Sequence, residues 1–160
     1  MNRYKFLYLF WLMPLAFLFL IIQQGTVYYG INDTFENGTS YTAEVLEFEL
    51  KQIAAQTNGY IVLQFKTKDG TEIQRQLSLP VEMAGDLQEI RVVPVRYNPG
   101  GWQEIVLLPT IDTQKNLVWT NGLMAFVALL ITTGIAIAAH RFANKKLSED
   151  QEEFVIERVD

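Results

Sequence analysis

The stretch FLYLFWLMPLAFLFLII, from Phe6 to Ile22, runs for 17 residues without a charged side chain. As a helix rising about 1.5 Å per residue, it would cover about 26 Å, close to the ~30 Å hydrocarbon core of a bilayer. The neutral Gln23 and Gln24 that follow can carry the same helix into the headgroup region. The stretch therefore predicts a transmembrane helix over residues 6–24.

A cleaved signal peptide is the competing interpretation of this stretch, because MNRYK at residues 1–5 resembles a basic leader. No small-residue cleavage site follows, since the chain reads IQQGTV from Ile22 to Val27. The stretch is also longer than the apolar part of an ordinary signal peptide. We therefore expect an uncleaved anchor, with residues 1–5 as a short cytoplasmic N-terminus.

A second uncharged block, LVWTNGLMAFVALLITTGIAIAA, occupies residues 117–139. Its 23 residues would measure about 35 Å as a helix, which is long enough to span a bilayer with some tilt. It predicts a second transmembrane helix, followed by a cytoplasmic tail at residues 140–160. A capping-box pattern, Ser148-Glu149-Asp150-Gln151, opens a short solvated helix or strand there, or a docking peptide for a cytoplasmic partner.

The charges beside the two blocks set the orientation. The flanking cations are Arg3, Lys5, Arg141, Lys145 and Lys146. Because positive residues stay on the cytoplasmic side, both ends of the chain are expected inside and the intervening segment outside. The predicted location is the bacterial inner membrane, with an N-in, C-in topology.

Small residues recur at helical spacing along the second block. They are Ala125, Ala128, Thr132, Ala136 and Ala139. Small side chains let two membrane helices approach closely, where packing rather than hydrophobicity drives association. We predict a helix-packing interface on this stripe, and either a partner subunit or the first helix of the same chain could occupy it.

Residues 25–116 form a polar segment that we expect to be a β-rich domain outside the cytoplasm. Residues 26–40 read as a connector rich in turn-forming side chains. The formal net charge of −5 is spread along the chain, so the basic patch that nucleic-acid binding needs is lacking. With no cysteine in the sequence, neither disulfides nor thiol catalysis are available.

Alternation of apolar and polar residues predicts the strands of this domain. The alternating apolar sets are Leu46, Phe48 and Leu50, then Ile61, Leu63 and Phe65, then Ile73 and Leu77. Asp69-Gly70 between the last two sets is a strong hairpin signal. Residues 80–86 read as a loop, and residues 90–97 and 104–108 as two further strands around a turn at 98–101.

The predicted fold is therefore a membrane protein of the α+β class. Two transmembrane helices flank a small antiparallel β-barrel or sandwich of about five strands in this prediction. Within it, we expect Phe65 and Tyr97 to pack in the core or at its rim.

A family resemblance adds to this prediction. A strand–Asp-Gly–strand unit is followed by Gly85-Asp86 and then by V-x-V-x-Y-x-P, formed by Val93, Val95, Tyr97 and Pro99. This order, between two apolar helices, resembles the bacterial membrane proteins of the family called domain of unknown function 3592. The resemblance covers residues 41–108 and, more loosely, both helices; extra residues at 87–92 depart from the pattern. It implies an architecture and no activity.

The residue types that catalysis or metal binding needs are scarce. His140 is the only histidine, and beside Arg141 at the end of the second block an interfacial anchor is its simpler role. Glu44, Glu47 and Glu49 lie on or beside one predicted strand, where a solvated charged face is a simpler explanation than a cation site. We predict no catalytic residue, no metal ligand, no cofactor and no enzymatic activity.

Two functions fit this pattern. The leading hypothesis is a non-catalytic accessory or scaffolding subunit of a larger membrane complex in the bacterial envelope. Its partners would be the lipid bilayer and other membrane subunits, or further copies of the chain, and not nucleic acid. The alternative is an extracytoplasmic binding module for a small molecule, a lipid or an envelope component.

Overall fold

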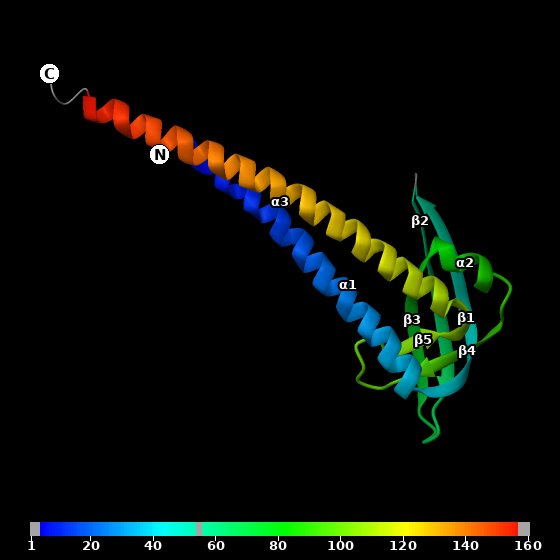
Figure 1. The fold of residues 1–160 in the computed structure, drawn as a ribbon. Coiled ribbons are helices and arrows are strands. Elements are labelled where there is room, and N and C mark those ends of the chain that lie inside the picture. Colours follow the sequence, from blue (N-terminus) through cyan, green and yellow to red (C-terminus); the bar gives the residue numbers. More distant parts are fainter. Residues whose placement is uncertain (1–3, 54–55, 157–160) are drawn as a thin grey trace. The chain divides into compact units, whose positions relative to one another are not determined.

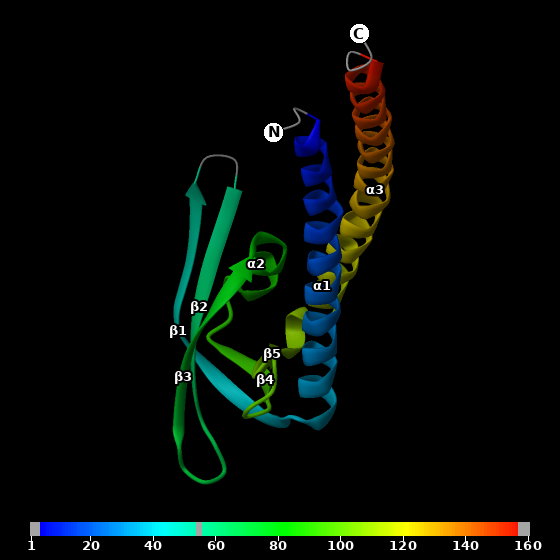
Figure 2. The same ribbon diagram turned by 90° about the vertical axis from the view of Figure 1, so that its left-hand side faces the viewer.

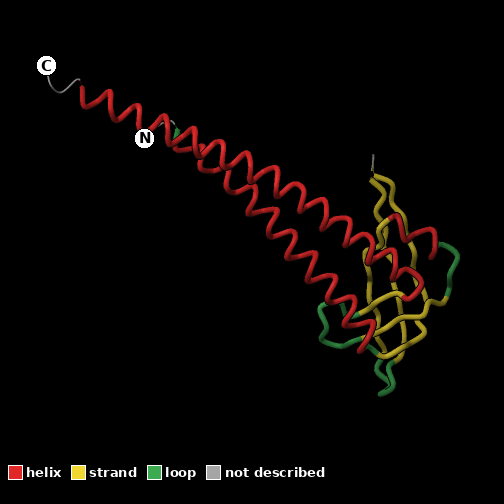
Figure 3. The backbone as a smooth tube through the Cα atoms, in the orientation of Figure 1, coloured by secondary structure: helices red, strands yellow, loops and turns green. Residues whose placement is uncertain are grey.

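The computed structural model describes residues 4–53 and 56–156, and it is an α+β protein with long helices before and after an antiparallel sheet (Figure 1). The elements, in chain order, are η1 (Lys5–Trp11), α1 (Leu12–Asn37), β1 (Thr39–Ile53), β2 (Gln56–Lys66), β3 (Glu72–Pro80), α2 (Val81–Leu87), β4 (Val92–Tyr97), β5 (Ile105–Leu107), η2 (Leu108–Thr110) and α3 (Ile111–Ile156). Figure 3 shows the same succession of helix and strand along the backbone.

The chain divides into two compact units. One contains the described residues up to Gln24 together with those from Thr120 onward, so it consists of helical segments from both ends of the chain. The other is Gly25–Trp119, which holds the sheet, α2 and the adjoining ends of α1 and α3.

In the described residues, the strands form a single five-stranded sheet in the order β3-β2-β1-β4-β5, antiparallel throughout. The long β1 serves two neighbours: Thr39–Glu44 pairs with β4, and Glu44–Ile53 pairs with β2. A bulge between Val45 and Glu47 lies close to the change of partner. The sheet curls into a half-barrel with β3 and β5 at its edges (Figure 2). It is therefore neither the closed barrel nor the two-sheet sandwich that the strand count suggested.

The core lies between the curled sheet and α2. Its fully buried members include Ile61 and Leu63 of β2, Leu79 of β3, Met83 and Leu87 of α2, Val93 and Val95 of β4, and Leu107 of β5. The alternating residues of β2 and β4 thus point inward, as their period of two requires. Three aromatic rings extend the core: Tyr41 stacks on Phe65 with centroids 5.3 Å apart, and Tyr97 meets Phe65 edge-on at 5.4 Å.

The expected Asp-Gly hairpin is confirmed between β2 and β3. Gly70 has φ +85°, a left-handed conformation that glycine adopts without steric cost. The amide of Gly70 donates to the carbonyl of Thr67 at 3.0 Å, and the amide of Thr67 donates to the carbonyl of Thr71 at 2.9 Å. The pKa of the Asp69 carboxyl is held below its usual value by hydrogen bonds that stabilise the ionised form. The donors are the Thr67 hydroxyl, then the backbone amide of Asp69 and the side chain of Thr71.

Two expected irregular segments are wrong. Residues 80–86 do not form a loop, because α2 begins at Val81. Residues 26–40 are not an irregular connector, since α1 continues to Asn37. The apolar residues 117–139 lie inside a longer helix, α3, which extends over Ile111–Ile156.

Candidate helix-packing interface and sheet cleft

The small-residue stripe of α3 lies mainly on a shielded face. Ala136 is fully buried and Ala125 nearly so, while Ala128, Thr132 and Ala139 are half-buried. Ala143, two turns beyond Ala136, is also fully buried. A helix cannot bury its own alanines to this degree, so another element must cover this face.

Contacts with the first helical segment identify that element. A Cβ added at Gly122 would lie 3.9 Å from the Cβ of Gln24 on α1. At the opposite end, the Tyr8 hydroxyl donates to Oδ1 of Asn144 at 2.7 Å. The centroid of the His140 ring lies 5.1 Å from that of Tyr8 and 6.4 Å from that of Trp11.

The covered face of α3 also includes residues outside the predicted stripe. It runs through Gly122, Ala125, Thr132, Ala136, His140 and Ala143. Steps of three, four and seven residues along this line are those of helices that pack side by side with a left-handed crossing. Reading the alanines alone missed Gly122, His140 and Ala143, although the spacing of three and four could have found them.

Thr132 is the one member of the predicted stripe with a hydroxyl. Its Oγ1 lies 2.8 Å from the carbonyl oxygen of Ala128 and 3.2 Å from that of Leu129, and it donates back along its own helix. The hydroxyl of Thr132 therefore has its hydrogen-bond acceptors within α3. What Thr132 contributes to the packing face is a small side chain.

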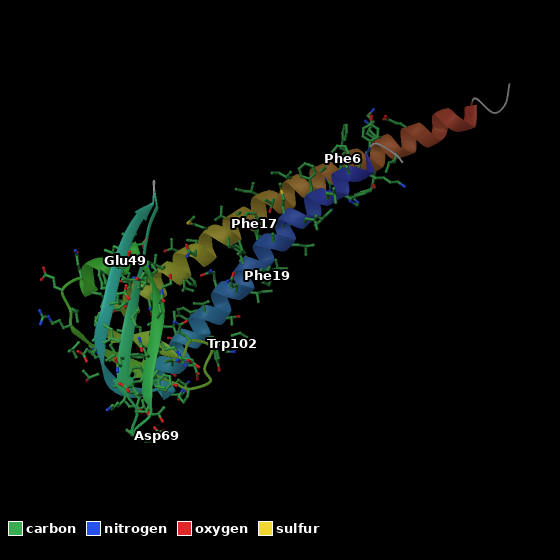
Figure 4. The ribbon with its side chains drawn as sticks, turned by 180° about the vertical axis from the view of Figure 1, so that it is seen from behind. Phe6, Phe17, Phe19, Glu49, Asp69 and Trp102 are labelled. Carbon is green, nitrogen blue, oxygen red and sulfur yellow. The ribbon has the colours of Figure 1, made fainter. Side chains whose placement is uncertain are left out.

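The remaining faces of both helices carry large apolar side chains that the protein leaves uncovered. On α1 and η1 these include Phe6, Leu9, Leu15, Phe19 and Ile22; on α3 they include Leu123, Met124, Leu130 and Ile131. Figure 4 shows Phe6, Phe17 and Phe19 along the first of these helices. Both helices are long and apolar enough to cross a membrane.

A shallow polar cleft lies on the sheet. It has a volume of about 360 Å³ and is lined by Thr42, Glu44, Gln64, Phe65, Lys66, Glu72 and Val92. Two of the lining residues are bonded to each other, since the Gln64 amide donates to the Glu72 carboxylate. Two glutamates and one lysine are thus among the residues that line the cleft, and its volume is at the lower end of the range for small-molecule sites.

The carboxylates of β1 have a structural partner. The Tyr60 hydroxyl on β2 donates to Oε1 of Glu47, and hydrogen bonds to Glu47 and then Glu49 raise the pKa of the Tyr60 phenol. Within the described residues, no group of three or more His, Asp or Glu side chains could hold a metal ion. Glu47 and Glu49 therefore act in the structure as acceptors for a cross-strand phenol.

The loop between β4 and β5 is fastened to the end of α1. The Thr34 hydroxyl, fully buried, donates to the carbonyl of Gln103. On the preceding residue, Oδ2 of Asp33 accepts a hydrogen bond from Nδ2 of Asn98 at 2.9 Å. Nothing in the sequence of this supposed connector indicated that its polar side chains have such partners.

Comparison of the chain with models of protein families, with curated protein sequences and with solved structures gives no match.

Proposed function

We propose that this chain is an integral protein of the bacterial inner membrane, in which α1 and α3 cross the bilayer and hold the sheet outside the cytoplasm. In this role it serves as a non-catalytic accessory or scaffolding subunit of a larger membrane complex. The partner subunits, or further copies of the chain, would contact its outward helix faces and its β domain.

The exposed apolar surface of the two helices carries the proposal. In the most apolar 18-residue stretch of the first helix only 6% is buried within the protein, and in the corresponding stretch of the second helix only 11% is buried. The buried core helix of a soluble protein would show the opposite. Because each large apolar side chain left in water forgoes about 1.5–3 kcal/mol, this surface calls for lipid or protein around it.

Contacts between the first and last helices support retention of the first helix. A signal peptide that is removed would not be expected to form specific side-chain contacts with a distant helix of the chain. Here, Tyr8 hydrogen-bonds to Asn144, and its ring packs on that of His140. The orientation follows from the five cations beside the apolar blocks, which the positive-inside rule puts in the cytoplasm.

Cysteine labelling tests the topology directly, because the chain has no cysteine of its own. Lys68→Cys in the β2–β3 turn and Lys145→Cys near the end of α3 make the same change at two exposed positions. In intact spheroplasts a membrane-impermeant maleimide should label the first variant, and the second only after permeabilisation. Labelling of Lys145→Cys alone would overturn the orientation.

The subunit role is tested by purification in mild detergent. We expect the chain to copurify with defined membrane proteins or as an oligomer. A monodisperse monomer from native membranes, with no stoichiometric companion, would contradict this role.

The family resemblance remains a proposal of its own. It is supported by the part that the matching residues play: Val93 and Val95 are buried in β4, and Tyr97 belongs to the aromatic cluster. These residues support an architecture and carry no activity with them.

The polar cleft favours the alternative, a binding module for a small extracytoplasmic molecule. Glu44, Glu72 and Lys66 would give such a ligand charges of both signs to contact. Mass spectrometry of small molecules retained by the purified protein, compared with a Glu44→Lys variant, tests it. A molecule lost only from the variant would favour this function over the subunit role.

A further inference from the structure

The loop that joins β4 to β5 carries an exposed tryptophan on a rigid support. Its turn is closed by a hydrogen bond from the amide of Gly101 to the carbonyl of Asn98 at 3.1 Å, and Gly100 has φ +83°. The amide of Asn98 donates to the carbonyl of Glu104 at 2.9 Å and closes the whole loop. Trp102 stands on it with 80% of its surface exposed.

Three contacts fix this loop against α1. They are the hydrogen bonds from Asn98 to Asp33 and from Thr34 to Gln103, and the close approach at Gly30. A Cβ at Gly30 would lie 3.1 Å from the Cβ of Trp102 and 3.2 Å from the amide nitrogen of Gln103. The loop therefore lies flush with α1 at Gly30, and Figure 4 shows Trp102 beside that helix.

Gly30 is at the level where α1 would leave the membrane. From Phe6, where the apolar stretch begins, twenty helical residues rise about 30 Å and reach Thr26, so that Tyr28 lies just past the hydrocarbon core, in the headgroup region. Tyr28 and Tyr29 are exposed on α1, as is Trp119 on α3. Gly30 lies two residues past Tyr28, about 3 Å farther along the helix axis.

The chemistry of the loop suits that level. An indole offers a broad apolar body and one N–H donor, which is why tryptophan is enriched where acyl chains meet headgroups. The loop residues 98–103, NPGGWQ, carry no charged side chain. The loop is therefore not repelled by anionic headgroups, and no charge has to lose its water when it enters the headgroup region.

We propose that Trp102 inserts into the headgroup region of the outer leaflet, so that the β4–β5 loop is a third membrane attachment beside α1 and α3. This inference rests on the membrane topology proposed above. The attachment fixes the β domain at the bilayer surface, because the same loop is fastened to α1 through Asp33 and Thr34.

The three tryptophans of the chain, Trp11, Trp102 and Trp119, allow a sharp test. Two single-tryptophan proteins are made, one keeping Trp102 and one keeping Trp119, with phenylalanine at the other two positions. Each is reconstituted into phosphatidylcholine vesicles whose lipids are brominated either near the headgroup or near the chain end. Tryptophan fluorescence then reports contact with lipid, and acrylamide quenching reports contact with water.

We expect both proteins to be quenched more strongly by bromines near the headgroup than by those near the chain end. If Trp119 is quenched while Trp102 is reached only by acrylamide, the inference fails and the proposed topology stands. If neither tryptophan is quenched by lipid, the topology fails as well. Shielding of Trp102 from acrylamide in native membranes, without quenching in vesicles, would identify a protein partner and overturn the lipid contact.

Discussion

Nε of Arg75 on β3 lies 3.7 Å from Oε2 of Glu104, the residue just before β5. Since β3 and β5 are the two edges of the five-stranded sheet, this ion pair spans the open side of the half-barrel. The sheet is curled enough for side chains at its two edge strands to form an ion pair, although the backbones of these strands are not hydrogen-bonded to each other. A charged pair at both edges also discourages the addition of a strand from another chain.

This pair is expected to contribute little to stability. Arg75 and Glu104 keep 49% and 41% of their side-chain surface exposed, so water and salt screen their attraction. A double-mutant cycle with Arg75→Gln and Glu104→Gln should give a coupling energy of about 0.2–1 kcal/mol in denaturant unfolding. The coupling should vanish at high salt, and one that persists there would mean that the side chains interact by packing.

The β2–β3 turn depends on the backbone conformation of Gly70. Because Gly70 has φ +85°, Gly70→Ala should lower the free energy of unfolding by roughly 1–2 kcal/mol. Gly85→Ala in α2 is the control, since space around it is open and its backbone is helical. That change should raise stability by about 0.4–1 kcal/mol. Equal effects in thermal melts of the two variants would contradict this account of the turn.

Phe65 supports the aromatic end of the core. It is buried and meets both Tyr41 and Tyr97, so truncation leaves a cavity that three elements border. Phe65→Ala should cost about 3–5 kcal/mol, visible as an early loss of the near-ultraviolet circular dichroism signal on heating. Leu46→Ala on β1, an exposed apolar position, should change the melting temperature little. A similar loss in both variants would place Phe65 outside the core.

The strands and the hairpin could be predicted because their signals are local. Alternation fixed which residues of β2 and β4 face inward, and Asp69-Gly70 marked the turn. Short-range patterns do not determine how far a sheet curls, so an open half-barrel could not be told from a barrel or a sandwich.

The missed helical segments have two different causes. Residues 26–37 contain Gly, Asn, Asp and Thr, which are poor helix formers, and the structure keeps them helical through tertiary contacts. The cationic groups of Arg96 and Lys115 lie over the ring of Phe35 in this segment. The Thr34 hydroxyl donates a hydrogen bond to the carbonyl of Gln103. In α2 the signal was present, because Met83, Ala84 and Leu87 have helical spacing and are buried, but Pro80 and Gly85 suggested a loop.

Tyr60 should titrate later than an ordinary tyrosine. Hydrogen bonds to Glu47 and Glu49 favour the neutral phenol, so its pKa in the folded protein lies above the usual 10.0. A raised pKa means that the bond stabilises the fold fully below pH 10 and stops doing so as the pH rises through the folded-state pKa. The difference in absorbance titration between the wild type and Tyr60→Phe isolates this phenol. Glu47→Gln should move its titration to lower pH, and an unchanged midpoint would refute the assignment.

The last prediction concerns the packing of α1 on α3, on which the proposed two-helix anchor depends. The Cβ of Gln24 and a Cβ built at Gly122 lie 3.9 Å apart, within the range of about 3.5–4.5 Å that disulfides require. In this cysteine-free chain, Gln24→Cys combined with Gly122→Cys should therefore form an intramolecular disulfide in oxidised membranes.

That crosslink can then report on the buried alanines. Ala136→Leu, added to the cysteine pair, places a large side chain on the covered face, where overpacking costs about 1–3 kcal/mol, so the crosslinked fraction should fall. Ala138→Leu makes the same change on an exposed face two residues away and should leave the fraction unchanged. Gel mobility without reductant measures both. Equal crosslinking in the two variants would mean that α1 does not cover Ala136, and the alanines would then be free for a partner subunit or for lipid.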